Sequence, residues 1–160
     1  MKLTMQLNLF SDIPKDIIKT LSITDVSKLL TYTEELQAAS DSTHKATFTL
    51  NGKRYGFIPS LEDITLGEYA DIEMLFRDDV HRNLPELMAI LYRPIVEEKG
   101  DVYTIEAYDG NTTIRAEEFK NMKAIMVQGA LLFFWSLGTE LLEILPSFLM
   151  ELTKGITKEF

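Results

Sequence analysis

Five acidic residues gathered around one expected helix start are the side chains best placed to bind a cation or to position a water molecule. They are Glu62, Asp63, Glu68, Asp71 and Glu73. Hard cations prefer carboxylate oxygens, but loops that bind them alternate their ligands more tightly and contain a turn glycine. Acidic residues near a helix start also stabilise the helix dipole. We expect this structural role, and a small metal-dependent hydrolase using residues 62–73 remains an alternative.

Other residues capable of chemistry are sparse. The two histidines, His44 and His81, lie far apart in the sequence, and neither has a ligand-type neighbour at the spacing of a metal pair. We expect both to be exposed to solvent. The sequence has no cysteine, no Gly-x-Ser-x-Gly motif and no glycine-rich phosphate loop. These patterns predict no catalytic residue, no cofactor and no metal, and they favour a non-enzymatic protein.

The composition indicates a globular protein with an acidic surface. The chain has 160 residues, of which 46% are hydrophobic and 26% charged, so one folding unit with a real core is expected. A net charge of −9 disfavours binding to nucleic acid, because a phosphate backbone repels such a surface. The longest apolar run, Ala124–Leu137, is shorter than the roughly 20 residues of a membrane span. No membrane association is therefore expected.

The first residues alternate between apolar and polar side chains. The apolar positions are Met1, Leu3, Met5, Leu7 and Leu9. A period of two predicts a strand with one buried face. Because an unpaired strand edge is adhesive, this strand must pair within the fold or add to another chain, which makes these five residues candidates for partner binding.

Two helices and a polar connector are expected next. Asp12 can cap a short helix that has Pro14 in its first turn, and Thr24 can cap a longer helix that ends at Ala39. The connector, residues 38–45, is the natural place for a boundary. We therefore divide the chain into an N-terminal strand and helical appendage, residues 1–45, and a main α+β domain, residues 46–160.

The main domain begins with clear local signals. Asn51-Gly52 suits the tight turn of a β-hairpin over residues 46–58. Thr65 and Glu68 have the spacing of a capping box at a helix start. Asn83 can cap a further helix, which Pro94 limits, and residues 101–108 alternate as a strand. Glu97 and Glu98 are expected to be a solvated pair before the turn at Gly100.

The apolar run Ala124–Leu137 predicts a helix that is buried on nearly every side. Phe133, Phe134 and Trp135 cannot all face one direction, because successive helical residues turn by about 100°. Either other elements enclose the helix, or one of these aromatic side chains anchors a partner. Arg93, next to Pro94, can hydrogen-bond the last carbonyls of its helix or bind an acidic partner.

The expected order is strand, two helices, hairpin, two helices, strand and then helices. This pattern predicts an α+β fold that is mostly helical. In it, an N-terminal strand, a hairpin and one further strand pack with about six helices around the central apolar helix.

From the hairpin onward the chain carries a series of short motifs in a fixed order. The motifs are Tyr55-Gly56-Phe57-Ile58-Pro59, Leu61-Glu62-Asp63-Ile64-Thr65, Gly67-Glu68-Tyr69, Met88-Ala89-Ile90-Leu91-Tyr92-Arg93-Pro94-Ile95, Tyr103-Thr104-Ile105-Glu106, Gly129-Ala130-Leu131, Phe133-Phe134 and Leu137-Gly138. This series resembles small virion proteins of tailed bacteriophages, above all those of Bacteroides-type hosts and crAss-like phages. The resemblance covers roughly residues 46–150. It implies a virion-structural or tail-assembly role, including that of a tail-assembly chaperone, and it transfers no catalytic residue.

These observations lead to one expected function and two alternatives. We expect a non-enzymatic bacteriophage protein that contacts other virion or assembly proteins, or other copies of itself, in the virion neck or tail or as a chaperone. It would reside in the bacterial host cytoplasm during assembly and then in the virion. The alternatives are the metal-dependent hydrolase and a host-directed inhibitory binding protein.

Overall fold

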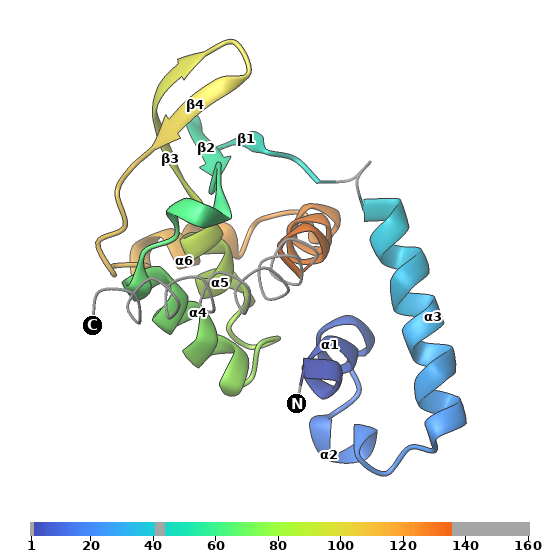
Figure 1. Cartoon of the computed structure of the whole chain (residues 1–160). Helices are drawn as coiled ribbons and strands as arrows, with labels where there is room; N and C mark the ends of the chain where they lie inside the picture. Colours follow the sequence, from blue (N-terminus) through green and yellow to red (C-terminus); the bar gives the residue numbers. More distant parts are fainter. Residues whose placement is uncertain (1, 41–43, 136–160) are drawn as a thin grey trace, which may run out of the picture.

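The computed structural model describes residues 2–40 and 44–135, and over these residues the protein is an α+β structure rich in helices (Figure 1). Its strands form one antiparallel sheet in the order β1-β2-β3-β4. The expected fold class is confirmed at this level. No helix in the described ranges has the length and apolar character needed to cross a membrane.

The N-terminal segment is a helix, so the predicted strand is wrong. Helix α1 spans Lys2–Ser11. Most of its residues, among them leucine, methionine, lysine and glutamine, favour a helix, and Thr4 is the one β-branched residue of the kind that favours a strand. Leu9 joins the main hydrophobic core, and Leu7 is buried outside that cluster. Two different sides of α1 are therefore covered, and a helix that is buried on two sides can show the same alternation of apolar and polar residues as a strand.

Two helices follow α1, and their starts differ from those expected. Helix α2, Lys15–Ile18, begins after Pro14, whereas Asp12 makes no cap and has a positive φ of 54° in the connector. Helix α3, Ile23–Ser40, begins one residue before Thr24. The hydroxyl oxygen of Ser22 accepts a hydrogen bond from the amide of Asp25. Ser22, and not Thr24, therefore accepts from a free amide at the start of this helix.

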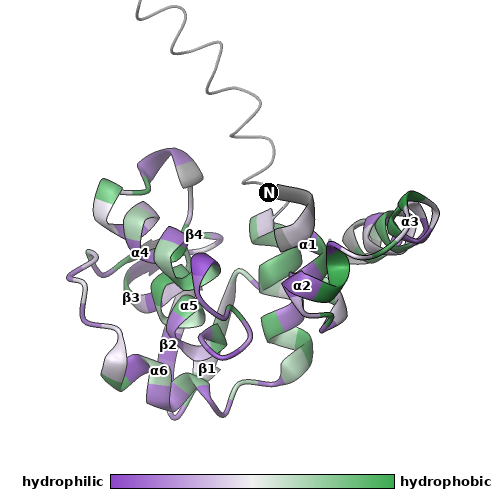
Figure 2. Ribbon diagram, turned by 90° about the horizontal axis from the view of Figure 1, so that it is seen from below, coloured by the Kyte–Doolittle hydropathy of each residue, from purple (hydrophilic) through white to green (hydrophobic). Residues whose placement is uncertain are grey.

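Helix α3 lies beside α1 at one side of the molecule (Figures 1 and 2). Thr33 is buried on the side of α3 that faces α1, where Gln6 donates a hydrogen bond to its hydroxyl. Ile23 and Tyr32 lie on exposed parts of the same helix.

The predicted β-hairpin is confirmed. Strands β1, Thr47–Leu50, and β2, Lys53–Phe57, pair across a turn at Asn51-Gly52. Both turn residues have positive φ, 50° and 78°, as this turn type requires. The aromatic pair Phe48 and Tyr55 lies on the face of the sheet that packs into the core.

The predicted capping box is also confirmed. After the short 3-10 helix η1, Leu61–Asp63, helix α4 spans Leu66–Arg77, with Thr65 and Glu68 satisfying each other's backbone amides. Helix α5 spans Leu84–Leu91 with Asn83 at its start, although the Asn83 side chain bonds to Asp78 and makes no cap hydrogen bond.

Strand β3, Tyr92–Lys99, was not expected, because Pro94 and the charged run after it are unusual in strands. It follows α5 directly and pairs with β2 on one side and with β4, Val102–Ile105, on the other. A register shift at Val96 places an irregularity after the proline. Glu97 and Glu98 are therefore strand residues, and Glu98 is ion-paired with Arg54.

The β3–β4 hairpin extends away from the helices, and α4, α5 and α6, Thr113–Phe119, gather near the other end of the sheet (Figure 1). Residues 124–135 form the described part of the apolar helix. Ser136 and Leu137, like the predicted segment around Phe148, lie outside the described residues. The core joins helices and sheet through large aromatic side chains, namely Phe48, Tyr55, Phe57, Phe76, Tyr92 and Phe119.

Candidate functional site

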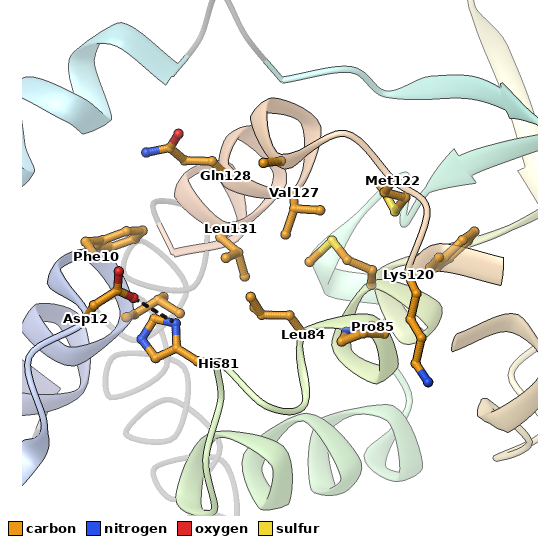
Figure 3. A pocket seen from close by; sticks show the side chains of 14 residues that line it. Phe10, Asp12, His81, Leu84, Pro85, Lys120, Met122, Val127, Gln128 and Leu131 are labelled. Carbon is orange, nitrogen blue, oxygen red and sulfur yellow. Dashed lines mark ion pairs between the residues drawn. The ribbon is translucent and has the colours of Figure 1, made fainter. Parts of the chain in front are cut away.

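An open cavity of about 510 Å³ lies between α1, α5, the end of α6 and the apolar helix (Figure 3). Leu9 and Phe10 of α1 form one wall, Met88 of α5 another, and Val127 and Leu131 of the apolar helix a third. A volume of several hundred Å³ with mostly apolar walls is typical of binding pockets. The cavity exists because α1 is a helix that packs beside the apolar helix.

The polar residues of the cavity lie at its ends. His81 and Asp12 lie at one end, with the Asp12 Oδ1 3.5 Å from the His81 Nδ1, and Lys120 lies at the other (Figure 3). Lys120 is already ion-paired with Glu117 at 2.6 Å. The described lining contains no serine, threonine, cysteine or tyrosine that the histidine could activate. The arrangement therefore suits the binding of an apolar group better than nucleophilic catalysis.

His81 holds the turn between α1 and α2 in place. Its Nε2 lies 2.6 Å from the carbonyl oxygen of Asn8, a distance that requires this nitrogen to donate. The Asn8 side chain in turn donates to the carbonyl of Ile13 at 2.9 Å. Lys15 donates to the carbonyl of Phe76 at 3.1 Å, which ties the same turn to α4. The expectation of a solvent-exposed His81 is wrong, because its ring is half-buried in these contacts.

The acidic cluster expected around residues 62–73 does not form a cation site. Glu68 is buried and ion-paired with Arg93, Asp71 accepts a hydrogen bond from Tyr108 at 2.5 Å, and Glu73 pairs with Arg77 at 2.7 Å. Within residues 2–40 and 44–135, no three histidine, aspartate or glutamate side chains gather in a way that could hold a metal ion. Three of the five carboxylates thus have structural partners.

The Glu68–Arg93 ion pair is the most deeply buried charged feature of the described structure. The two residues are 2% and 7% exposed, and Arg93 Nη1 donates to Glu68 Oε1. Glu68 Oε2 accepts hydrogen bonds from the Thr65 amide at 2.7 Å and from the Thr65 hydroxyl at 2.8 Å. Arg93 Nε donates to the carbonyl of Glu106 at 2.7 Å. The pair therefore joins the start of α4 to β3 and to the segment after β4.

This environment sets the ionisation of Glu68. Burial by itself would raise the pKa of Glu68, but hydrogen bonds from Thr65 and from Arg93 hold that pKa below its usual value. The nearby Tyr108, whose ring lies 5.7 Å from the guanidinium carbon of Arg93, has a raised pKa because of burial and its hydrogen bond to Asp71. Both residues therefore keep the charge state that their contacts need at neutral pH.

Arg93 makes the helix-end contact expected of it and is ion-paired within the chain. It lies 3.4 Å from the carbonyl oxygen of Ile90 in the last turn of α5, and its acidic partner is the chain's own Glu68. A candidate residue for binding another protein is thus engaged internally and lies outside the cavity.

Phe133, Phe134 and Trp135 point to different parts of the fold. Phe133 packs edge-on against Phe57 at 5.5 Å, Phe134 stacks on Phe76 at 6.2 Å, and Trp135 packs edge-on against Phe10 at 6.3 Å. All three are half-buried. Enclosure by other elements thus describes this part of the apolar helix better than a free aromatic anchor does.

His44 is also half-buried, so its expected exposure is wrong as well. Its ring stacks on Phe133 at 4.0 Å and meets the edge of Phe57 at 4.9 Å. Its Nδ1 is buried without a hydrogen-bond partner in the described structure, and burial lowers the pKa of His44.

Helix α1 places the N-terminal candidate residues for partner binding on different sides. Leu9 lines the cavity, whereas Leu7 is buried on another side of α1. The structure does not describe Met1 or the side chains of Leu3 and Met5. As residues of helix α1, Leu3, Met5, Leu7 and Leu9 offer no free strand edge to a neighbouring sheet.

The cavity itself was not anticipated from the sequence. Its walls come from four separate segments, and the apolar periodicity of each segment indicates burial without indicating which one it faces. The one available signal was His81 next to a helix start, which was interpreted as a surface residue.

The comparisons with known proteins identify no family. No protein-family model matches the chain, and no curated protein and no solved structure matches it significantly.

Proposed function

We infer that this chain is a non-enzymatic bacteriophage protein that acts through protein–protein contacts, either in the neck or tail of the virion or as a chaperone of tail assembly. The observation that carries this proposal is the open cavity at α1, α5 and the apolar helix, which has apolar walls and no nucleophile among its described lining residues. Such a surface suits an apolar side chain of another protein.

Two further observations support the proposal. The motifs of residues 46–150 resemble virion proteins of tailed phages. Large apolar side chains are exposed at several places on the described surface, among them Ile23, Leu66 and Ile114. Because the protein has a net charge of −9, its copies repel one another and can remain in solution before assembly despite these exposed side chains.

Size-exclusion chromatography with light scattering over a concentration series is the first test. A closed oligomer or a growing ladder supports a virion component, because the chain then carries its own complementary surfaces. A monomer of 18.3 kDa that forms a complex with a neck or tail protein of the same phage supports a chaperone. A monomer that binds none of these proteins on co-expression contradicts the proposal.

The hydrolase alternative has a separate test. Millimolar Mg²⁺, Ca²⁺ or Mn²⁺ should leave the melting temperature unchanged if the carboxylates near residue 62 are structural. A metal-dependent rise in melting temperature that disappears in Asp63→Asn would favour the hydrolase. Asp63 is the better choice for this variant, because a change at Glu68 disturbs the buried ion pair whichever function is correct.

A further inference from the structure

We propose that the cavity between α1, α5 and the apolar helix receives a bulky apolar side chain from a positively charged segment of a partner protein. This rests on the proposed protein-contact function and specifies the partner that the contact requires. The argument combines the shape of the cavity, the adaptability of its walls and the charge at its mouth.

The walls are suited to an apolar side chain that arrives from outside. The cavity is open, and its volume of about 510 Å³ exceeds that of any single side chain, so a large residue and part of its neighbours can enter. Met122, which is half-buried, and Met88, which is 1% exposed, are among the lining residues. Methionine side chains are flexible and polarisable, and they adapt to different apolar partners.

The charge at the mouth of the cavity determines which charge the partner segment must carry. The carboxylate of Asp12 is 93% exposed at one end of the cavity, and its one contact in the described structure is the His81 ring at 3.5 Å (Figure 3). The one cation in the described lining, Lys120, is paired with Glu117. Asp12 thus has no lysine or arginine partner in the described structure, and its carboxylate is the charge at the mouth that is open to a basic residue; the net charge of the chain, −9, has the same sign. A lysine or arginine beside the entering side chain is attracted, and an acidic residue is repelled.

Asp12 is also held in position for this role. Its φ of 54° is tolerated by aspartate, and the turn around it is fixed by hydrogen bonds that Asn8 makes to His81 and Ile13. A carboxylate on a fixed turn keeps its direction relative to the cavity. Asn in place of Asp12 tolerates the same backbone conformation, so the charge can be removed without strain.

Two synthetic peptides test the proposal on the full-length chain. Both contain an adjacent leucine and phenylalanine, flanked by arginines in one peptide and by glutamates in the other. The readout is the NMR signals of the Met88 and Met122 methyl groups. Met74, exposed on α4 and not part of the described lining, is the internal control. The arginine peptide should shift the signals of Met88 and Met122 and leave that of Met74 in place, and the glutamate peptide should shift none.

Variants then separate the cavity from the charge. Val127→Trp fills the cavity and should abolish binding of the arginine peptide. Asp12→Asn should weaken it about two- to five-fold, the range of an exposed charge pair, while Asp16→Asn on α2 should leave it unchanged. If Val127→Trp does not fold, the paired peptides and Asp12→Asn decide the question.

Two results would overturn the inference. Equal binding of both peptides would refute the charge argument, and the absence of any shift at Met88 and Met122 would refute the cavity as the binding site. Either result leaves the light-scattering and co-expression outcomes intact, so a failure of this inference is distinguishable from a failure of the proposed function.

Discussion

Replacing Arg93 by methionine should destabilise the protein far more than a typical loss of an ion pair. Methionine retains an apolar stem of similar length, so the change removes chiefly the charge and its hydrogen bonds. Glu68, 2% exposed, would keep its hydrogen bonds to Thr65 but lose its cationic partner. Removing one partner of a buried pair typically costs about 3–5 kcal/mol, a large part of a total stability of about 5–15 kcal/mol.

Urea unfolding followed by circular dichroism measures this loss, and the chain supplies a matched control. Arg54 pairs with Glu98 through a hydrogen bond of 3.0 Å, but the two side chains are 46% and 32% exposed. Arg54→Met should therefore cost far less stability, because solvent screens an exposed pair. Replacing both Glu68 and Arg93 by methionine should recover much of the stability that Arg93→Met loses, since no unpaired charge stays buried.

The stability lost in Arg93→Met should also depend on pH. Burial opposes ionisation of Glu68, but the hydrogen bonds from Thr65 and Arg93 lower its folded-state pKa below the usual 4.5. The stability that these contacts supply is therefore fully present above pH 4.5 and is lost as the pH falls through the folded-state pKa. The difference between wild type and Arg93→Met should shrink over that acid range. A cost at neutral pH no larger than that of Arg54→Met would refute the reasoning.

Three further changes test other contacts. A Cβ on Gly56 would lie 2.8 Å from Cδ2 of Tyr103, whose hydroxyl is bonded to a backbone carbonyl, so Gly56→Ala should cost about 1–3 kcal/mol in urea unfolding. Gly67→Ala is the control and should be neutral or stabilising, because beyond its own helix backbone and chain neighbours the nearest atom to an added Cβ is Thr65 Oγ1 at 3.9 Å. Trp135→Ala should lower stability by about 3 kcal/mol, because the ring packs on two other aromatic side chains, and an unchanged melting temperature would contradict that packing. Burial lowers the pKa of His44 in the folded state, so the contribution of His44 to stability is present above pH 6.5 and falls as the pH drops below this value. Between neutral and mildly acidic pH, the melting temperature of His44→Phe should therefore fall less than that of the wild type. Equal falls would contradict this prediction.

Local signals in the sequence predicted some elements well. The Asn51-Gly52 turn and the Thr65–Glu68 capping box are confirmed, because each depends on residues a few positions apart and on their own backbone preferences. The general α+β class followed from the same local patterns. The helix over residues 124–135 is confirmed, but the expected burial on nearly every side is only partly met: Leu131 and Leu132 are buried, whereas Ile125 is 56% exposed.

Predictions that depended on distant segments were less successful. Strand β3 was missed because its pairing with β2 and β4 outweighs the low strand preference of Pro94 and the charged run after it. The N-terminal segment was assigned to a strand because alternating apolar residues are also compatible with a helix covered on two sides. Both errors arose because burial depends on neighbours that a local pattern does not identify.

The sequence by itself determined which residues carry turns, caps and apolar faces, because these depend on intrinsic backbone preferences and on hydrogen bonds between near neighbours. It also contained Glu68 and Arg93 as two separate candidates. Only the tertiary structure decided that they form one buried pair, since their side chains meet across elements 25 positions apart in the chain. It likewise decided that Asp12 and His81 lie at the mouth of one cavity, because α1 packs against a helix more than a hundred residues away.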